Sequence, residues 1–268
     1  MNKHDKQGTA LITGASTGIG AAYAERLAQR GFDLLLVARD QARLDDVAAR
    51  LRAEFGVSVD TLSADLTVAT DVARVVQRLS SDSSISMLVN NAGVAVSTSL
   101  LDSDPDALER MISLNVLAVT RLAVAAAGAF ATRERGTLIN VASALALAPE
   151  LFNGAYSGTK AYVLNLSQAL DKELAPKGVR VQVVLPGATR TELWARAGVD
   201  IANLPAAMVM EVGEMVDAAL AGLDLGETVT IPSLPEIADW NTLNATRLSL
   251  TPRISLQHAA ARYGKAAA

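Results

Sequence analysis

Short apolar runs alternate with longer helical stretches along most of this chain, and this alternation restricts the fold more than any other feature. Strands between helices of ten or more residues predict βαβ units, in which right-handed crossovers place helices on both faces of the sheet. The expected fold is therefore α/β, with a doubly wound, mostly parallel, seven-stranded sheet. The runs expected to be its strands are residues 9–13, 32–38, 57–63, 85–89, 137–141, 179–185 and 228–231.

Apolar residues at helical spacing predict the helices between these strands. The expected helices cover residues 18–30, 41–55, 70–79, 104–131, 153–175 and, near the C-terminus, 254–263. No linker rich in Gly, Ser or Pro divides the 268 residues, so a single domain, 1–268, is expected. Within it, residues 192–212 break the alternation and are expected to form a flap of small helices. Residues 234–268 form a C-terminal extension.

The composition argues against several classes of protein. The chain has no Cys and only two His, which excludes disulfides and argues against a metal site built on thiolates or imidazoles. Its net charge of -4 argues against a nucleic-acid partner. The apolar stretch at 122–131 is shorter than the roughly 20 residues of a membrane span, and residues 1–8 have no apolar signal region. A cytoplasmic globular protein without metal is expected.

The first predicted strand runs directly into a glycine-rich turn, Gly14 to Gly20, and a helix follows. Glycines permit a tight turn and a close backbone approach to a ligand. A helix N-terminus offers free N–H groups and a positive dipole end to phosphate. The turn therefore predicts a dinucleotide site, although many strand-to-helix turns use glycine for geometry alone.

Tyr156 and Lys160 lie four residues apart on a predicted helix, so they share one face. A nearby ammonium, together with an oxidised nicotinamide, would favour the phenolate and lower the phenol's pKa. Tyr156 could then exchange a proton with a substrate oxygen that the hydroxyl of Ser143, after a strand, also binds. Alternatively, these are an ordinary surface pair and a turn residue, and Asn115 is a capping or packing residue.

Taken together, these motifs resemble the short-chain dehydrogenase/reductase family. The resemblance covers Gly14-x-x-x-Gly18-x-Gly20, Asn90-Asn91-Ala92-Gly93, Tyr156-x-x-x-Lys160, Ser143 thirteen residues before Tyr156, and Pro186-Gly187 with Thr191. It implies a Rossmann-type fold and catalytic roles for Asn115, Ser143, Tyr156 and Lys160. In this family pattern Lys160 also holds the nicotinamide ribose, and Asn115 holds a water of the proton relay. The cofactor-binding residues it implies are Gly14, Ser16, Thr17, Gly18, Ile19, Gly20, Arg39, Asp65, Leu66, Asn91, Ala92, Gly93, Tyr156, Lys160, Pro186, Gly187, Thr189 and Thr191.

The end of the second strand bears on the choice between NADP and NAD. An acid there would accept the ribose 2′-OH of NAD, whereas an arginine would pair with the 2′-phosphate of NADP. The family's acid position is Ala38 here, and Arg39 follows it, so NADP is favoured. Asp40, the next residue, could serve as the acid instead, so NAD remains the alternative cofactor. Asp65 resembles an adenine contact but could equally cap the next turn.

The substrate surface is expected to be apolar and to suit a hydrophobic ketone, an aliphatic chain or a steroid-sized ring. It would be lined by Leu145, Leu147, Leu151, Phe152, Leu193, Trp194, Leu204, Met208 and Met210. Ordinary core packing would explain the same residues. The last strand lacks the Val-Asp-Gly-Gly ending of family tetramers, which argues against the usual tetramer. A homo-oligomer, such as a dimer through 104–131 and 153–175, is expected; alternatively, apolar residues of these helices such as Leu117, Leu122 and Val124 pack on the sheet.

The expected function is NADP-dependent reduction of a ketone, or oxidation of a secondary alcohol, by hydride transfer. The alternatives are an NAD-dependent alcohol dehydrogenase of the same family and a dinucleotide-binding sensor without turnover. An intact Ser143, Tyr156 and Lys160 argues against the sensor, since a pure binder has no chemical need for them. A nucleotide-sugar epimerase is disfavoured by the glycine spacing.

Overall fold

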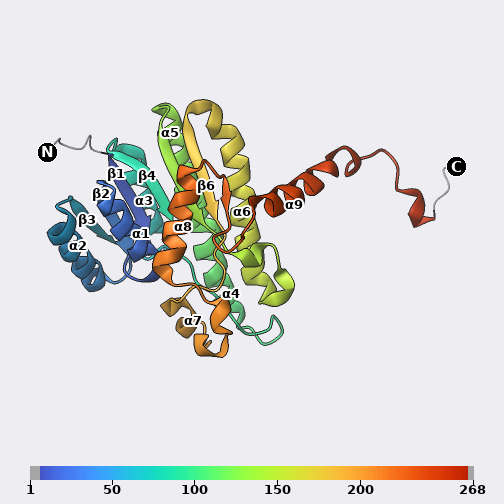
Figure 1. Ribbon diagram of the computed structural model, residues 1–268, viewed down its shortest axis with the longest axis horizontal. Helices are drawn as coiled ribbons and strands as arrows, with labels where there is room; N and C mark the ends of the chain where they lie inside the picture. Colours follow the sequence, from blue (N-terminus) through green and yellow to red (C-terminus); the bar gives the residue numbers. More distant parts are fainter. Residues whose placement is uncertain (1–6, 265–268) are drawn as a thin grey trace. The chain divides into compact units, whose positions relative to one another are not determined.

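The expected parallel sheet is present in the computed structural model, which describes residues 7–264. All seven strands are parallel, in the order β3-β2-β1-β4-β5-β6-β7 (Figure 1). This confirms the predicted α/β, Rossmann-type class. The chain order reverses between β1 and β4, so the carboxyl ends of these two strands flank a crevice. The strands are β1 (Thr9–Thr13), β2 (Asp33–Ala38), β3 (Val59–Ser63), β4 (Ile85–Asn90), β5 (Gly136–Val141), β6 (Val179–Val184) and β7 (Val229–Thr230).

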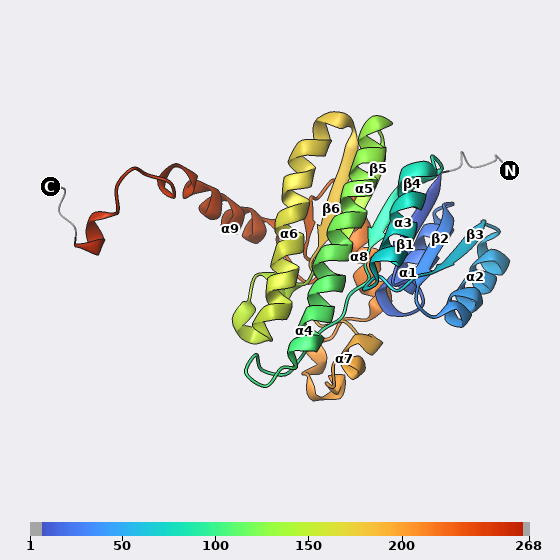
Figure 2. The ribbon, with the colours of Figure 1, turned by 180° about the vertical axis from the view of Figure 1, so that it is seen from behind.

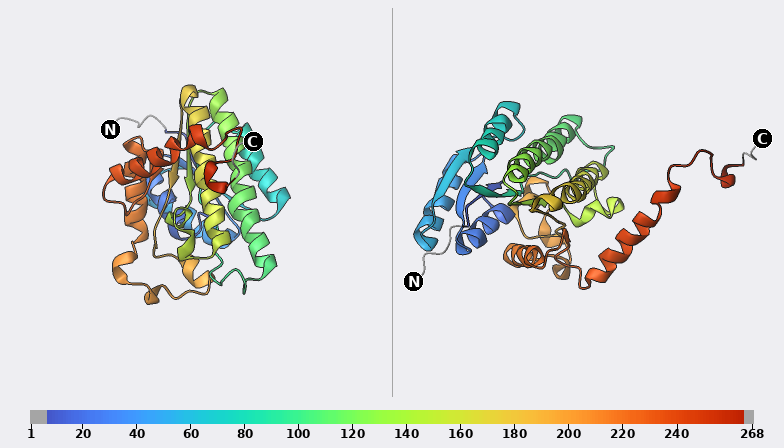
Figure 3. Two further views of the ribbon diagram at one scale, coloured as in Figure 1. Left: turned by 90° about the vertical axis from the view of Figure 1, so that its right-hand side faces the viewer. Right: turned by 90° about the horizontal axis from the view of Figure 1, so that it is seen from above.

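Helices cover both faces of the sheet (Figures 2 and 3). The helices on one face are α1 (Gly18–Gln29), α2 (Gln41–Phe55) and α8 (Val212–Asp224). Those on the other face are α3 (Ala69–Ser81), α5 (Val119–Thr132) and α6 (Gly154–Leu174). Strand β2 shows why both layers form, because Leu34 and Leu36 pack into the first and Leu35 into the second.

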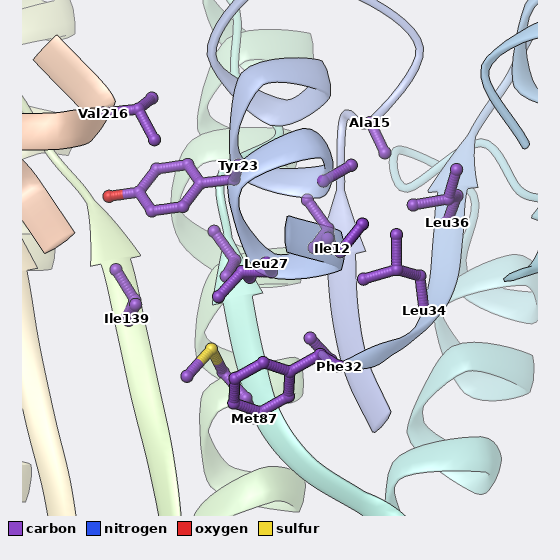
Figure 4. Packing of buried hydrophobic residues seen from close by; sticks show 14 of the residues in the cluster. Ile12, Ala15, Tyr23, Leu27, Phe32, Leu34, Leu36, Met87, Ile139 and Val216 are labelled. Carbon is purple, nitrogen blue, oxygen red and sulfur yellow. The ribbon is translucent and has the colours of Figure 1, made fainter. Parts of the chain in front are cut away.

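Large side chains of α1 fill the core between the sheet and the helices α1, α2 and α8. Tyr23 and Leu27 are fully buried against the sheet, and Val216 of α8 lies close to the Tyr23 ring (Figure 4). At the outer edges of α1 and α8, Arg26 pairs with Asp217 at 2.7 Å and Arg30 with Asp224 at 2.8 Å. This packing holds the start of α1, and hence the glycine turn before it, in a fixed position.

The long helix expected at 104–131 is divided in the structure. It consists of α4 (Pro105–Ile112), a π-helical turn (Ser113–Ala118) and α5. By length and composition the whole segment Pro105–Thr132 could cross a membrane, but it packs Leu122, Ala126 and Phe130 into the core. π-Helical turns are rare and often mark functional positions; this one contains Asn115.

Two helices were not expected, and one expected helix is wrong. α8 was not predicted, and α9 (Ile237–Ser249) lies where no helix was expected. Residues 254–263 do not form a helix; they contain only a 3₁₀ turn at Ala261–Tyr263. Short helices depend on packing for stability, and Ile254 and Leu256 are exposed. The apolar residues of 254–263 therefore had no buried surface to fix them as a helix.

The segment 192–212 is the expected flap of small helices. It contains α7 (Glu192–Arg196) and 3₁₀ turns at Ile201–Asn203 and Ala206–Met208. Its base is closed by backbone hydrogen bonds from Arg190 to Met210 and from Met210 to Ala188, and by an ion pair of 2.6 Å between Arg190 and Glu211. By its internal contacts the chain divides into two compact units, residues 1–232 and 233–268. That the whole chain forms a single domain therefore remains a prediction.

Candidate active site

The glycine turn between β1 and α1 needs its glycines for close packing. Gly14 and Gly18 have φ values of +67° and +57°, a region that side chains disfavour. A Cβ on Gly20 would collide with the carbonyl oxygen of Gly14, and one on Gly14 would lie 2.8 Å from Nδ2 of Asn91. The turn is therefore pressed against α1 on one side and the end of β4 on the other.

The same turn leaves the N-terminus of α1 without a side-chain cap. Thr17 is the N-cap residue, yet its side chain accepts no hydrogen bond from the helix. Ser16, Thr17, Gly18 and Ile19 are all half-buried rather than covered. The first N–H groups of a twelve-residue helix are thus left for another acceptor, which fits the pyrophosphate of a dinucleotide.

The end of β2 carries one exposed cation. The Arg39 side chain is 67% exposed, and its Nη1 lies 4.0 Å from Oδ2 of Asp65. Asp65 is partly desolvated, but hydrogen bonds from Thr67 and the charge of Arg39 hold the pKa of its carboxyl below the usual range. Asp40 caps α2 by accepting from the backbone N–H of Arg43. Asp40 is thus engaged in the helix, whereas Arg39 has no close hydrogen-bond partner among the described residues.

The predicted adenine contacts divide into two kinds. Asp65 accepts from the N–H and the hydroxyl of Thr67 in a tight turn, whereas the N-cap residue of α3 is Val68, so Asp65 does not cap that helix. Leu66 is buried in the second core layer.

On the other side of β1, Asn91 donates to the carbonyl of Thr13 at 2.9 Å, and the N–H of Ala92 donates to the Thr13 hydroxyl. Asn91 and Ala92 therefore tie the ends of β4 and β1 together behind the glycine turn.

Lys160, Asn115 and Gly93 meet at one point. A Cβ on Gly93 would lie 3.2 Å from Oδ1 of Asn115 and 3.4 Å from Nζ of Lys160, so a larger residue would have to displace both side chains slightly. Lys160 is buried and donates to the carbonyl of Val141 at 3.1 Å. Burial lowers its pKa to about 8. An ammonium has three donors, and no carboxylate pairs with this one in the described part of the chain, so Lys160 fits a ligand hydroxyl such as a ribose.

Tyr156 lies on the same face of α6 as Lys160, as expected. The Nζ of Lys160 is 5.8 Å from the centroid of the Tyr156 ring. Burial raises the pKa of Tyr156 to about 12, against a smaller lowering by its hydrogen bond with the Ser143 hydroxyl. Desolvation therefore dominates in the chain by itself, and the lowering expected from Lys160 together with an oxidised nicotinamide stays a prediction for the complex with cofactor.

Asn115 makes contacts that sequence reasoning did not foresee. Its Oδ1 accepts from the N–H of Val94, and its Nδ2 donates to the Val94 carbonyl and to the hydroxyl of Thr159. Thr159 in turn donates to the carbonyl of Tyr156. Asn115 thus holds the loop after β4 against the catalytic helix. No pattern in the sequence marked Thr159, since a buried helical Thr has no signature.

The segment after β6 borders the glycine turn. The Pro186 carbonyl accepts from the N–H of Ala144, beside Ser143. Thr189 is buried; its hydroxyl donates to the Gly187 carbonyl, and its own carbonyl accepts from Nε1 of Trp194 at 2.9 Å. The Thr191 side chain would meet a Cβ on Gly18 at 3.3 Å. The flap therefore begins directly against the expected phosphate site.

An aromatic contact joins the flap to Tyr156. The Phe152 ring lies edge-on to Tyr156 at 5.4 Å between centroids and edge-on to Trp194 at 6.4 Å. Around this row of three rings, Leu147, Leu151 and Met208 are exposed. This part of the expected apolar lining is therefore not consumed by core packing. Leu145, Leu193 and Leu204 are half-buried. Met210 instead packs against the first core layer, as the alternative of ordinary core packing expected.

A family model described as short chain dehydrogenase matches residues 8–201. The chain is 36% identical over 188 residues to the very-long-chain 3-oxoacyl-CoA reductase-B of Danio rerio, a match covering 69% of this chain and 60% of that relative. It is also 36% identical to an uncharacterized oxidoreductase of Staphylococcus saprophyticus, over 69% of this chain and 79% of the other.

Two solved structures resemble the chain over nearly all of its length. A short-chain dehydrogenase from Sphingobium yanoikuyae in complex with NADPH is 52% identical, with a TM-score of 0.93, covering 96% of this chain and 99% of the other. A bulky-bulky ketone specific alcohol dehydrogenase from Comamonas testosteroni is 47% identical, with a TM-score of 0.89, covering 97% and 100%.

Proposed function

The chain belongs to the short-chain dehydrogenase family and is thus an oxidoreductase acting on CH–OH or C=O groups; we propose that it reduces bulky, apolar ketones with NADPH. The reverse reaction is oxidation of the corresponding secondary alcohols with NADP⁺. One observation carries the proposal: Tyr156, hydrogen-bonded to Ser143 and on the same helix face as the buried Lys160, lies beside the aromatic contact of Phe152 with Trp194.

In this proposal Tyr156 is the proton donor for reduction. A phenol whose pKa is raised to about 12 stays protonated at neutral pH, so it can give its proton to a carbonyl oxygen. The Ser143 hydroxyl orients and polarises the same oxygen. NADPH supplies the hydride when it is bound. Lys160 holds a ribose hydroxyl, and its charge stabilises the phenolate that Tyr156 becomes.

Asn115 supports the relay by fixing positions. Its amide binds both the loop after β4 and, through Thr159, the first turn of α6. Its proposed role in holding a water extends the path for the proton from Lys160 to solvent. The cofactor itself would be held along the turn from Gly14 to Gly20, by the ends of β4 and β6, and by Thr191 at the start of the flap.

The preference for NADP over NAD rests on the end of β2. Arg39 is exposed there, and its guanidinium can pair with a 2′-phosphate. The acid that could instead accept the 2′-OH of NAD is Asp40, which is already the N-cap of α2. The 52% identical relative was solved with NADPH, which supports the same choice.

The preference for bulky ketones rests on the apolar surface beside Tyr156. Phe152 and Trp194 are in edge-on contact there, and Leu147, Leu151 and Met208, on the segments that also carry these rings, are exposed. Such a surface binds large apolar groups and gives little affinity to small polar ones. The relative from Comamonas testosteroni is named for bulky-bulky ketones, in agreement with this proposal.

We also propose that the protein is a cytoplasmic homo-oligomer. Leu117 and Val124 project from the π-helical turn and α5 and are 57% and 56% exposed, so they do not pack on the sheet. Large apolar side chains exposed on one helix favour burial against another subunit.

The test is a titration of the purified chain with NADPH and with NADH, followed by assays of NADPH oxidation with a diaryl ketone and with acetone. Tight NADPH binding, weaker NADH binding and reduction of the diaryl ketone are expected. Binding of neither cofactor would overturn the functional proposal, and reduction of acetone alone would overturn the substrate class.

A further inference from the structure

Many large apolar side chains of the C-terminal unit, residues 233–268, are exposed. Ile237, Leu243 and Leu248 of α9 lie within one broad face of that helix, and Leu243 and Leu248 are 50% and 52% exposed. Beyond α9, Leu250, Ile254, Leu256 and Tyr263 are exposed as well. We call residues 237–263 the arm. Apolar side chains gathered in this way favour burial against another surface.

The arm is also basic, in contrast to the rest of the chain. The arm has three arginines and one acidic residue, Asp239, and therefore a net charge of +2. The whole chain has a net charge of -4, so the rest of it has -6. None of Arg247, Arg253 and Arg262 forms an ion pair with any residue that the structure describes. The arm is therefore suited to an acidic, apolar surface.

The body of the chain, residues 1–232, has such a surface in two adjoining loops. Leu100 and Leu101 lie in the loop before α4, and Leu147 and Leu151 lie in the segment before α6; all four are exposed, Leu101 by 98%. Asn153 ties the loops together, donating to the Thr98 carbonyl at 2.7 Å and to the Ser103 hydroxyl. A Cβ on Gly154 would touch Leu100. We call these four leucines and their acidic neighbours the rim.

The charge of the rim is opposite to that of the arm. The acidic residues on its two loops and the start of α4 are Asp102, Asp104, Asp106, Glu109 and Glu150. Arg110 is the basic residue among them, and it pairs with Asp104 at 3.6 Å. The rim thus offers exposed leucines among carboxylates, of which Asp104 alone forms an ion pair with a described residue, and the arm offers exposed leucines among arginines that form none.

We propose that the arm of one copy of this chain docks on the rim of a second copy. Both surfaces belong to the same chain and both are exposed in it, so a second copy satisfies each of them at once. Leu151 directly precedes Phe152, whose ring contacts Tyr156. The arm therefore covers the border of the partner's substrate site. This extends the homo-oligomer proposed above by naming its contact, and it does not depend on the reaction.

The absence of cysteine from the sequence makes a direct test simple. Two single-cysteine variants, Leu101→Cys on the rim and Ile254→Cys on the arm, are co-expressed with different tags and treated with a short bismaleimide. A cross-linked species of twice the chain mass that carries both tags is expected. Ala53→Cys, an exposed position on α2, replaces Leu101→Cys in the control and should give at least tenfold less of this species.

Three results would overturn the proposal. The first is cross-linking of the Leu101→Cys and Ile254→Cys pair no stronger than in the control. The second is a chain carrying both cysteines that cross-links only at the monomer mass, which would mean that the arm folds onto its own body. The third is co-sedimentation of the arm's parent chain with phosphatidylserine vesicles that Leu243→Asp with Leu248→Asp abolishes, while the cross-link is missing.

Sedimentation velocity separates this failure from that of the oligomer itself. A monomeric wild-type chain would remove both proposals. An oligomer without the cross-link would remove only the docking of the arm on the rim. If the arm docks as proposed, Leu243→Asp with Leu248→Asp lowers the assembled mass or weakens assembly at least tenfold, and Asn241→Asp, a change of charge without loss of an apolar group, has a smaller effect.

Discussion

The ammonium of Lys160 lies 5.8 Å from the centre of the Tyr156 ring, and both side chains are buried. At this separation neither group compensates the other for desolvation. Burial therefore raises the pKa of Tyr156 to about 12 and lowers the pKa of Lys160 to about 8. The chain without cofactor holds a protonated phenol next to an ammonium that is unusually ready to lose its proton.

This arrangement predicts how stability depends on pH. Between pH 8 and pH 10.5 the unfolded chain keeps its proton on Lys160 while the folded chain loses it, so the Lys160 side chain adds stability as pH rises. Below pH 8 the cost of burying the charge is paid in full. The variant Lys160→Met should therefore be more stable than wild type at pH 7, by a margin that shrinks towards pH 10.

Urea unfolding of the two proteins at pH 7, 8, 9 and 10 measures this margin. Lys172→Met, on the exposed side of the same helix, is the control and should show no such trend. A difference between Lys160→Met and wild type that stays constant over this range would contradict the account.

Replacing Arg39 tests the preference for NADP. Arg39→Ala should weaken NADPH binding by about 1.5 kcal/mol, or roughly tenfold, which is the lower end for a hydrogen bond to a charged group because Arg39 is exposed. NADH binding should barely change. Fluorescence titrations give both dissociation constants, with Arg50→Ala, an exposed arginine of α2, as control. Equal losses for both cofactors would refute the role of Arg39.

Removing one ring of the aromatic contact tests the substrate class. Trp194→Ala should raise the KM of a diaryl ketone about 2- to 10-fold, since an aromatic pair contributes about 0.5–1.5 kcal/mol beyond simple burial. Trp194→Phe keeps a ring edge at this place and should recover most of the loss. Steady-state assays with NADPH give these values. A KM that is the same in all three proteins would place the substrate elsewhere.

Two glycine substitutions should have opposite effects, because one glycine lies in the tightly packed turn and the other on an open face of a helix. Gly20→Ala should abolish cofactor binding and lower stability, because its Cβ would collide with the Gly14 carbonyl. Gly128→Ala meets nothing within 4 Å in the middle of α5 and should raise stability by about 0.5–1 kcal/mol. Thermal unfolding with and without NADPH measures both. A harmless Gly20→Ala would show that the turn is looser than its geometry indicates.

Much of this arrangement could be predicted from the sequence, because the responsible signals are local. Buried parallel strands such as Leu34–Val37 leave a continuous apolar run, and a helix with Tyr156 and Lys160 four residues apart must present both on one face. Motifs that follow strands in order also come together at one edge of a parallel sheet. The parallel sheet and the position of Gly14, Asn91 and Ser143 at the carboxyl ends of its strands follow from these rules, whereas the strand order was not predicted.

What could not be predicted depends on contacts between distant residues. Asn115, in the π-helical turn, is hydrogen-bonded to Val94 and Thr159, neither of which is near it in sequence. The raised pKa of Tyr156 depends on complete burial, which a spacing of four residues does not reveal. The helix wrongly expected at 254–263 had suitable spacing, but its apolar residues Ile254, Leu256 and Tyr263 are exposed.

The most direct test of the central claim is turnover by Tyr156→Phe with NADPH and a diaryl ketone, measured beside NADPH binding to the same protein. The account predicts binding within about twofold of wild type and a loss of turnover of roughly 10²- to 10⁴-fold, the usual contribution of a general acid. Tyr156→Phe that binds NADPH and turns over at the wild-type rate would contradict the assignment of Tyr156 as the proton donor.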